Sequence, residues 1–182
     1  MHLEFNPSSP SFHLGALALL MCAAMSSSPG LAAGDTQVGT ATGLPVPRYV
    51  SLRAGQVNLR QGPSKDHGTL WIYRREGLPV EITAEFETWR KIRDSEGTEG
   101  WVLHSLLSGK RTAIVSPWSK DGLIEIRERP NSESALAARL EPRVVGQIRK
   151  CDQNWCRVTG KGFDGYAPQK ELWGVYPNER LD

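Results

Sequence analysis

The chain has 182 residues, of which 22 are Lys or Arg and 20 are Asp or Glu, so its formal net charge is only +2. Basic residues form short pairs, such as Arg74-Arg75 and Lys110-Arg111, rather than a larger cluster. This balance argues against a basic surface of the kind that binds nucleic acid, and no nucleic-acid partner is expected.

The first 33 residues have the pattern of an export signal. Residues 13–25 form an apolar core, Ser26–Gly30 breaks it, and Gly30–Ala33 offers small residues for cleavage. The core is shorter than the roughly 20 residues that a membrane-spanning helix needs. Residues 1–13 lack the Lys or Arg that usually begins such a signal. We predict a signal peptide at 1–33, a periplasmic protein, and no stable membrane insertion once the signal is removed.

Residues 34–47 are rich in Gly, Thr, Ala and Pro and lack periodicity, which predicts a flexible lead. After them, short β-branched segments are separated by Gly and Pro every 8–12 residues or so, as in all-β domains. The expected strands are Val57–Arg60, Thr69–Arg74, Leu78–Ala84, Trp89–Arg93 and Glu99–Leu103, with Lys110–Ile114 as a possible last strand.

A similar series of segments follows a short linker at residues 116–119. Its expected strands are Leu123–Arg127, Val144–Lys150, Trp155–Val158 and Gly165–Ala167. Residues 135–140 fit a helical turn by propensity. Their place in the series matches Thr69–Arg74, however, so extended structure is favoured.

Cys151 and Cys156 flank a segment that can form a hairpin turn at Gln153-Asn154. With that turn, the two cysteines face each other at a non-hydrogen-bonded position, where Cα atoms lie about 4.5 Å apart. A disulfide accepts about 4.4–6.8 Å, so in an oxidising compartment we predict a disulfide rather than a catalytic thiol. Zinc would need two more ligands, and only His67 and His104 follow the signal; no metal or other cofactor is expected.

Four motifs recur in the same order, which indicates two copies of one domain of roughly 60 residues. The offset between the copies falls only from 67 to 65 residues along the chain. A domain this small is marginal alone, so each copy should rely on a disulfide or on its neighbour. The recurring pairs are Val57–Arg60 with Ile124–Arg127, Trp89–Ile92 with Trp155–Val158, Gly100–Val102 with Gly165–Ala167, and Leu107–Gly109 with Leu172–Gly174.

The same alignment places Glu85 and Arg90 of the first copy where the second copy has its two cysteines. We therefore predict that Glu85 and Arg90 face each other across a hairpin as an exposed ion pair. Such a surface pair contributes less than about 1 kcal/mol.

The repeated segments of this chain resemble the bacterial SH3-like domain. The resemblance rests on Val57–Ser64, Gly77–Val80, Trp89–Ile92 and Asp94–Val102, with a weaker second copy in register that ends in Leu172–Pro177. It implies an all-β fold of two tandem small SH3-like β-barrels, at 48–115 and 120–178, with a tail at 179–182. It also implies a cell-envelope protein that binds without catalysis, either to peptidoglycan or to partner proteins.

SH3-type domains bind ligands in a shallow groove lined by aromatic side chains. The resemblance places Trp89 and Trp155 at the groove tryptophan. The element Gly165–Pro168 supplies Tyr166 and Pro168, and Trp101 and Leu103 occupy the matching places of the first copy. The acidic, tyrosine-rich stretch used on proline-rich peptides is missing from both copies, so that ligand class is not expected.

Side-chain alternation bears on whether these tryptophans are exposed. Trp89 and Ile92 lie on opposite faces of an extended strand, so a core Ile92 puts Trp89 outside. A β-bulge would reverse this, and the core alternative stays open. Trp71 and Trp173 fit packing roles better, and Trp173 is placed to seal the two barrels together.

Non-catalytic binding of peptidoglycan or its stem peptides is the function we expect first. The alternatives are a protein–protein adaptor in an envelope assembly and a structural role without a ligand. The chain has no Gly-x-Ser-x-Gly, no His-Glu-x-x-His and no phosphate-binding Gly loop, so an enzyme is not expected.

Overall fold

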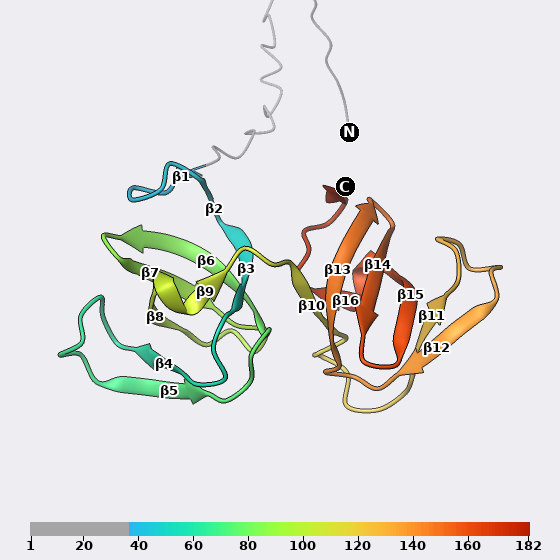
Figure 1. The fold of residues 1–182 in the computed structure, drawn as a ribbon, viewed down its shortest axis with the longest axis horizontal. Coiled ribbons are helices and arrows are strands. Elements are labelled where there is room, and N and C mark those ends of the chain that lie inside the picture. Colours follow the sequence, from blue (N-terminus) through green and yellow to red (C-terminus); the bar gives the residue numbers. More distant parts are fainter. Residues whose placement is uncertain (1–36) are drawn as a thin grey trace, which may run out of the picture. The chain divides into compact units, whose positions relative to one another are not determined.

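The computed structural model describes residues 37–182, so the predicted signal peptide at 1–33 lies outside the described residues. Asp35–Asp182 forms one compact unit. Its described residues form antiparallel strands, two short 3-10 helices and loops (Figure 1). In this part of the chain, no helix is long and apolar enough to cross a membrane.

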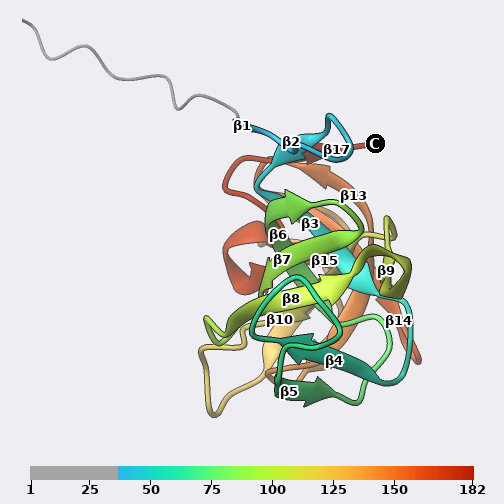
Figure 2. The ribbon, with the colours of Figure 1, turned by 90° about the vertical axis from the view of Figure 1, so that its left-hand side faces the viewer.

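The first barrel is a curled, seven-stranded antiparallel sheet, which Figure 2 views from its own side. Along the sheet the strands follow the order β5-β4-β8-β7-β6-β3-β9. Their bounds are β3 Arg48–Leu52, β4 Val57–Arg60, β5 Thr69–Tyr73, β6 Pro79–Phe86, β7 Trp89–Arg93, β8 Glu99–Leu103 and β9 Leu107–Ser108, with the 3-10 helix η1 (His104–Leu106) before β9.

The second barrel repeats this order as β12-β11-β15-β14-β13-β10-β16. Residues 136–140 are extended in β12, which confirms the expectation from the repeat. Arg180–Leu181 (β17), in the predicted tail, pairs with β13. The bounds are β10 Thr112–Val115, β11 Ile124–Arg127, β12 Leu136–Leu140, β13 Val145–Asp152, β14 Trp155–Gly160, β15 Phe163–Pro168 and β16 Leu172–Trp173, with η2 (Gln169–Glu171) before β16.

The boundary between the barrels differs from the prediction. We expected Lys110–Ile114 to close the first domain, but β10 pairs with β13 and β16 and so opens the second barrel. The physical reason is burial, since Ala113 and Val115 of β10 pack in the second core. Residues 109–111 therefore join the barrels, and residues 116–119 form a loop within the second barrel.

The lead before the first barrel is ordered from residue 37, contrary to the prediction of a flexible segment. Gln37–Val38 (β1) pairs with Pro45–Val46 (β2). The turn between them binds the carboxylate of Glu85: the amides of Ala41 and Thr42 donate to Oε2 at 3.0 and 2.8 Å, and the Thr42 hydroxyl donates to Oε1 at 2.8 Å. A buried carboxylate thus holds the lead in place.

The predicted pairing of Glu85 with Arg90 is confirmed, but its predicted exposure is wrong. The two residues are opposite each other on β6 and β7, with Arg90 Nε 3.3 Å from Glu85 Oε1. Arg48 Nη2 also donates to this oxygen at 2.6 Å, and the Glu85 side chain is 0% exposed. Glu85, Arg90 and Arg48 therefore form an internal charge network rather than a surface ion pair.

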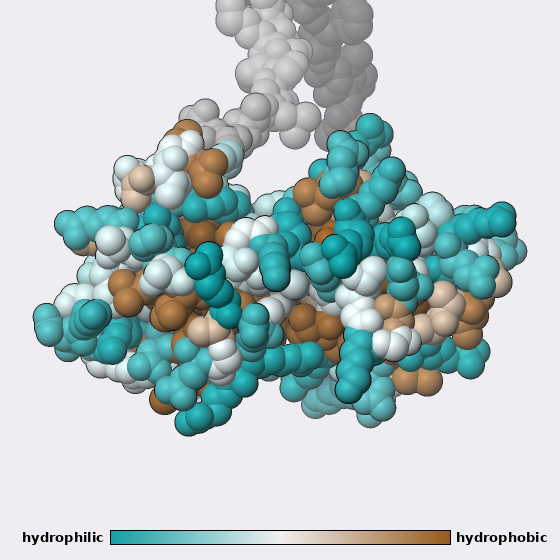
Figure 3. Space-filling model, viewed as in Figure 1, coloured by the Kyte–Doolittle hydropathy of each residue, from teal (hydrophilic) through white to brown (hydrophobic). Residues whose placement is uncertain are grey.

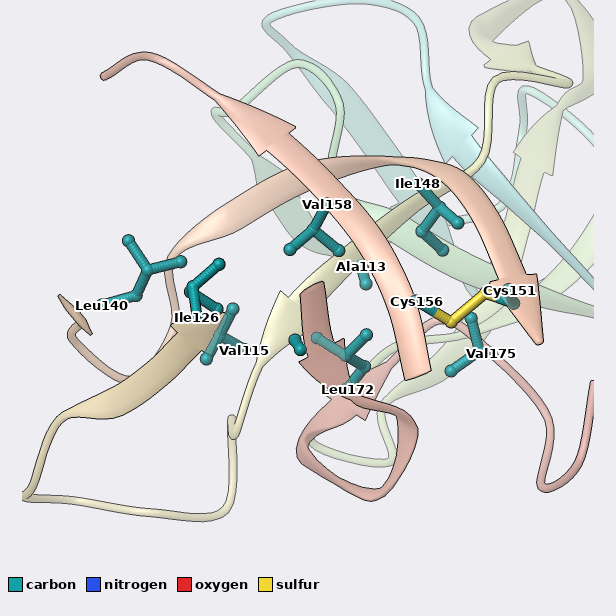
Figure 4. Close-up of a cluster of buried hydrophobic side chains, with 11 residues drawn as sticks. Ala113, Val115, Ile126, Leu140, Ile148, Cys151, Cys156, Val158, Leu172 and Val175 are labelled. Atoms are coloured by element: carbon teal, nitrogen blue, oxygen red, sulfur yellow. A yellow bond between two sulfur atoms is a disulfide. The ribbon is translucent and has the colours of Figure 1, made fainter. Parts of the chain in front are cut away.

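Each barrel has its own apolar core, and the second core includes the predicted disulfide (Figure 4). Cys151 and Cys156 are bonded and directly opposite on β13 and β14, with Cα atoms 4.1 Å apart. The hairpin prediction is therefore confirmed. Val57, Leu59 and Ile92 are fully buried in the first core, as strand alternation requires.

The curvature of both sheets has the same local origin. The register shifts between Ile82 and Ala84 on β6, and between Ile148 and Lys150 on β13. These two irregularities occupy equivalent positions of the repeat. Bulges increase local twist and bend a strand, which lets so short a sheet curl around its core.

Aromatic contacts join the two barrels, as expected for Trp173. The Trp173 ring meets Tyr49 of β3 edge-on at 5.1 Å, and the Tyr176 ring lies 4.7 Å from Tyr49. The Tyr176 hydroxyl donates to Glu81 Oε1 at 2.9 Å, and burial, followed by this hydrogen bond to a carboxylate, raises the pKa of Tyr176. The packing role proposed for Trp71 is wrong, because its side chain is 57% exposed.

Candidate binding grooves

One shallow groove lies on the outside of the first barrel, with a volume of about 220 Å³. We call it groove 1. It combines one aromatic wall with aliphatic, amide and cationic side chains. Its lining residues are Gln56, Asn58, Arg60, Lys65, Trp89, Leu103 and Leu106.

A second groove of about 310 Å³ lies on the second barrel, and we call it groove 2. Seven of its lining residues occupy the repeat positions of the seven residues of groove 1. In matching order these seven are Leu123, Glu125, Arg127, Ser132, Trp155, Pro168 and Glu171. Ile124 and Lys170 complete the lining. The fold therefore builds the same depression twice.

The structure brings together four of the six predicted site residues as two pairs. Trp89 lies opposite Leu103 on β7 and β8, and Trp155 lies opposite Pro168 on β14 and β15. Each pair lines its own groove. Trp155 and Pro168, together with Ser132 and Lys170, also line a neighbouring depression of about 610 Å³, so these four residues separate it from groove 2.

The two tryptophans differ in exposure. Trp155 is half-buried, as predicted. Trp89 is only 7% exposed, so the prediction that it is partly exposed is wrong. Trp89 is nevertheless absent from the packed apolar core, and Ile92 points into that core from the other face of β7. The predicted alternation is therefore confirmed, and Trp89 is a covered side chain of the outer face.

Trp101 and Tyr166 are half-buried but do not line the grooves. Each lies next to the arginine of its repeat motif, Trp101 opposite Arg60 and Tyr166 opposite Arg127. Tyr166 is also paired with Arg157, which binds Asp164 through two hydrogen bonds of 2.8 and 2.7 Å. The hydrogen bonds that Arg157 donates lower the pKa of the Asp164 carboxyl.

The motif arginines shape the grooves by holding loops. Arg60 Nη1 donates to the backbone oxygens of Lys65 and His67 at 3.0 and 2.7 Å. Arg127 Nη1 donates to the Ser134 oxygen, the repeat equivalent of His67, at 3.0 Å. Each arginine thus ties down the loop that carries Lys65 or Ser132 into its groove.

The glycines of the repeated Gly-aromatic motif allow the two strands beneath each groove to approach closely. A Cβ on Gly100 would lie 2.8 Å from the Arg60 backbone oxygen, and one on Gly165 would lie 2.7 Å from the Arg127 oxygen. Real Cβ atoms do not come this close. The motif is therefore a packing requirement of the crossing between β4 and β8, and between β11 and β15.

The polar chemistry of the grooves is unequal. In groove 1 the Asn58 side-chain oxygen is buried and has no hydrogen-bond partner among the described residues, and Arg60 and Lys65 supply two positive charges. Groove 2 has Glu125 where groove 1 has Asn58, and Glu171 where groove 1 has Leu106. Groove 1 therefore favours an anionic ligand with hydrogen-bond donors, and groove 2 is closer to neutral.

Sequence reasoning located the aromatic residues and missed the polar ones. Asn58, Arg60 and Lys65 lie in or just after the first motif of the repeat. A position-by-position comparison of the two copies of that motif could therefore have pointed to them. Over residues 37–182 no group of three or more His, Cys, Asp or Glu side chains is placed to hold a metal ion.

A family model described as a bacterial SH3 domain matches residues 53–109 and again residues 120–174. The chain belongs to the bacterial SH3 domain family. Each match covers one groove and most of one barrel, leaving out β3 in the first and β10 in the second, so both copies of the repeat are family domains. The family and the disulfide fit an extracytoplasmic, cell-wall-associated binding module.

Comparison with solved structures gives seven matching chains, among them two weak likenesses, and no curated protein matches the chain. NlpC2 from Trichomonas vaginalis is 12% identical with a TM-score of 0.32, over 70% of this chain and 48% of that one. NlpC1 from the same organism is 11% identical with a TM-score of 0.32, over 74% and 48%. This chain thus spans about half the length of either.

Proposed function

We propose that this protein is a non-catalytic binding module of the periplasm that holds peptidoglycan, or its stem peptides, in the two repeated grooves. The observation that carries the proposal is the match of seven lining positions between groove 1 and groove 2. A polymer with a repeating unit presents the same chemistry at many places. Two grooves at equivalent positions of one compact unit, each with a Trp and an Arg, can therefore bind different parts of such a polymer with avidity.

The groove chemistry supports a glycan or peptide ligand. An aromatic ring offers a flat apolar face, as sugars and methyl groups require, and Trp also offers an N–H donor. The unpartnered oxygen of Asn58 suits an amide or hydroxyl donor, and the guanidinium of Arg60 and the ammonium of Lys65 suit carboxylates. Sugar hydroxyls, amides and carboxylates all occur together in peptidoglycan.

Two observations support a periplasmic location for the protein. A disulfide that closes so short a hairpin persists in an oxidising environment such as the periplasm. The export pattern at 1–33 leads in the same direction.

Co-sedimentation with purified sacculi tests the proposal. We expect wild-type protein to pellet with sacculi, and Trp155→Ala and Lys65→Glu each to reduce the pelleted fraction. Trp118→Ala is the matched control, because Trp118 is 57% exposed and lies outside both grooves. Melting curves of the variants check that they stay folded. Wild-type protein that remains in the supernatant overturns the proposal, as does pelleting that neither groove variant reduces.

A further inference from the structure

Another cavity, separate from the grooves, lies between the two barrels and has a volume of about 340 Å³. We call it the cleft. Trp71, Tyr73 and Arg75 line it from the first barrel, and Ile114, Pro117 and Arg143 from the second. Its size is within the range of sites that bind small molecules and peptide side chains. Because both barrels contribute, the cleft exists only in the assembled pair.

Trp71 is unusual for the face of β5 on which it lies. It is opposite Leu59 in the register and two residues from Tyr73, so it shares the core-facing side with two buried residues. Its own side chain is nevertheless 57% exposed. The second barrel has Ala138 at the equivalent position. The fold itself therefore does not need a tryptophan here, and an exposed indole beside an apolar wall is a typical anchor for a ligand.

The cleft is lined by two carboxylates, Asp94 and Glu96, and two guanidiniums, Arg75 and Arg143. Asp94 is already engaged, since it accepts hydrogen bonds from the Tyr73 hydroxyl at 2.9 Å and from the Glu96 and Thr98 amides. Arg75 makes no ion pair among the described residues. Its guanidinium donates one long hydrogen bond, from Nη1 to the Arg143 backbone oxygen at 3.5 Å. Arg143 meets Glu96 only at 3.5 Å, with both side chains about two-thirds exposed.

The backbone around the cleft adds two observations. Arg143 has a φ of 67°, a left-handed conformation that is uncommon for a residue with a side chain and recurs at functional sites. In addition, β5 is the end strand of its sheet, so one edge of it is free to pair with another extended chain. Copy two has Arg139 in place of Ile72, a charge that discourages such pairing.

We propose that the cleft binds an extended segment of a partner protein, which pairs with the edge of β5, places an apolar side chain against Trp71, and presents a carboxylate to Arg75. Edge pairing supplies backbone hydrogen bonds, and the cleft supplies selectivity for the side chains. The guanidinium favours a carboxylate because it can bind both oxygens at once. This site is independent of the grooves and of any cell-wall ligand they bind.

Selection from a displayed library of random short peptides tests the inference on the folded protein with intact Asp35–Asp182. We expect enriched peptides to combine an aromatic or branched apolar residue with a nearby Asp or Glu. A synthetic peptide of the enriched sequence should bind wild-type protein. Trp71→Ala, which installs the residue of the second barrel, should weaken binding at least about tenfold, and so should Arg75→Gln. Binding should also weaken with added salt.

The matched control is Trp118→Ala, because Trp118 has the same 57% exposure as Trp71 but does not line the cleft. It should bind the peptide as wild-type protein does. Failure to enrich any peptide overturns the inference, as does an enriched peptide whose binding survives Trp71→Ala. If Trp71→Ala instead reduces only co-sedimentation with sacculi, the occupant is a wall component and the inference is wrong, whereas the grooves are tested separately by Trp155→Ala and Lys65→Glu.

Discussion

At the scale of single residues, the two barrels solve one structural problem with different chemistry. The position that holds Cys151 and Cys156 in the second barrel holds Glu85 and Arg90 in the first. The disulfide joins the two strands covalently. The ion pair joins them through charge and also recruits Arg48 and the lead at Ala41–Thr42. Residues at equivalent positions therefore link the two strands of the corresponding hairpin in each barrel.

The buried carboxylate predicts acid sensitivity. Burial raises the pKa of Glu85, but hydrogen bonds from Arg48, Thr42 and the backbone outweigh it and lower the pKa from 4.5 to about 2. A depressed folded-state pKa gives stability that is present above about pH 4.5 and lost as the pH falls toward 2, on the order of 3 kcal/mol. Urea unfolding across this range should show the loss in wild-type protein.

Glu85→Gln should be less stable than wild type at pH 7 by about 3–5 kcal/mol, because it leaves the buried Arg90 and the half-buried Arg48 without their counter-charge. It should also lose less stability than wild type between pH 4.5 and 2. Glu76→Gln is the control, since Glu76 is exposed and has no ion pair among the described residues. Parallel pH profiles for Glu85→Gln and wild type would contradict the assignment.

The disulfide predicts the absence of reactive thiols. Protein isolated from the periplasm and unfolded without reductant should not label at Cys151 or Cys156. The closed loop is short, so the chain-entropy relation gives a loss of only about 2 kcal/mol for the missing bond. Replacing both cysteines by Ser should cost more than this, because it also buries two hydroxyls in the second core. Labelling of both thiols would show that the bond does not form in the cell.

At the scale of elements, the repeat explains which parts of the fold were predictable. The alternation of Val57-Asn58-Leu59-Arg60 reports a half-buried strand, and its recurrence indicated β11 and also β12, whose Ala-rich composition alone suggested a helix. β10 was misassigned because all its residues are buried and apolar or small, so its pattern fits either barrel. Only long-range pairing with β13 and β16 assigns it.

The candidate site was also predictable only in part. Trp155 and Pro168 could be placed from the motifs, because strand alternation decides which face they occupy. The 7% exposure of Trp89 and the unpartnered oxygen of Asn58 depend on how loops fold over the outer face, and no local pattern reports that. Glu85 was misjudged for the same reason, since the lead that buries it is distant in sequence.

The crossing strands give a prediction for the Gly-aromatic motif. Gly165→Ala should destabilise the protein by about 1–3 kcal/mol, because its Cβ would lie 2.7 Å from the Arg127 backbone oxygen, and neither strand can move without repacking. Gly109→Ala is the control, because a Cβ there has no heavy atom within 4 Å. Chemical denaturation of both variants measures the difference. Equal stability for the two would refute the close-crossing argument.

At the scale of the whole molecule, the barrels are held together by Tyr49, Trp173 and Tyr176 and by the bond from Tyr176 to Glu81. Arg111, in the connection, binds Glu179 through two hydrogen bonds of 2.8 and 3.0 Å and lies 5.8 Å from the Tyr49 ring. On the face shown in Figure 3, apolar residues form separate patches among hydrophilic ones. The joint between the two barrels thus consists of a few aromatic rings and hydrogen bonds.

Calorimetry tests whether the joint couples the barrels. Wild-type protein should unfold in one transition. Trp173→Ala should separate the unfolding of the two barrels, because an aromatic pair contributes about 0.5–1.5 kcal/mol beyond its buried area. Trp118→Ala should leave the single transition intact, since that side chain is exposed. Two transitions already present in wild type would mean that the barrels fold independently.

The claim that two equivalent grooves bind one repeating polymer is tested most directly by an NMR titration of the protein with soluble peptidoglycan fragments. We predict that amide shifts change around Trp89, Asn58 and Lys65 in groove 1 and around Trp155 and Pro168 in groove 2, and that both sets follow the same ligand. Shifts confined to other surfaces, or no shifts at saturating fragment, would contradict the account.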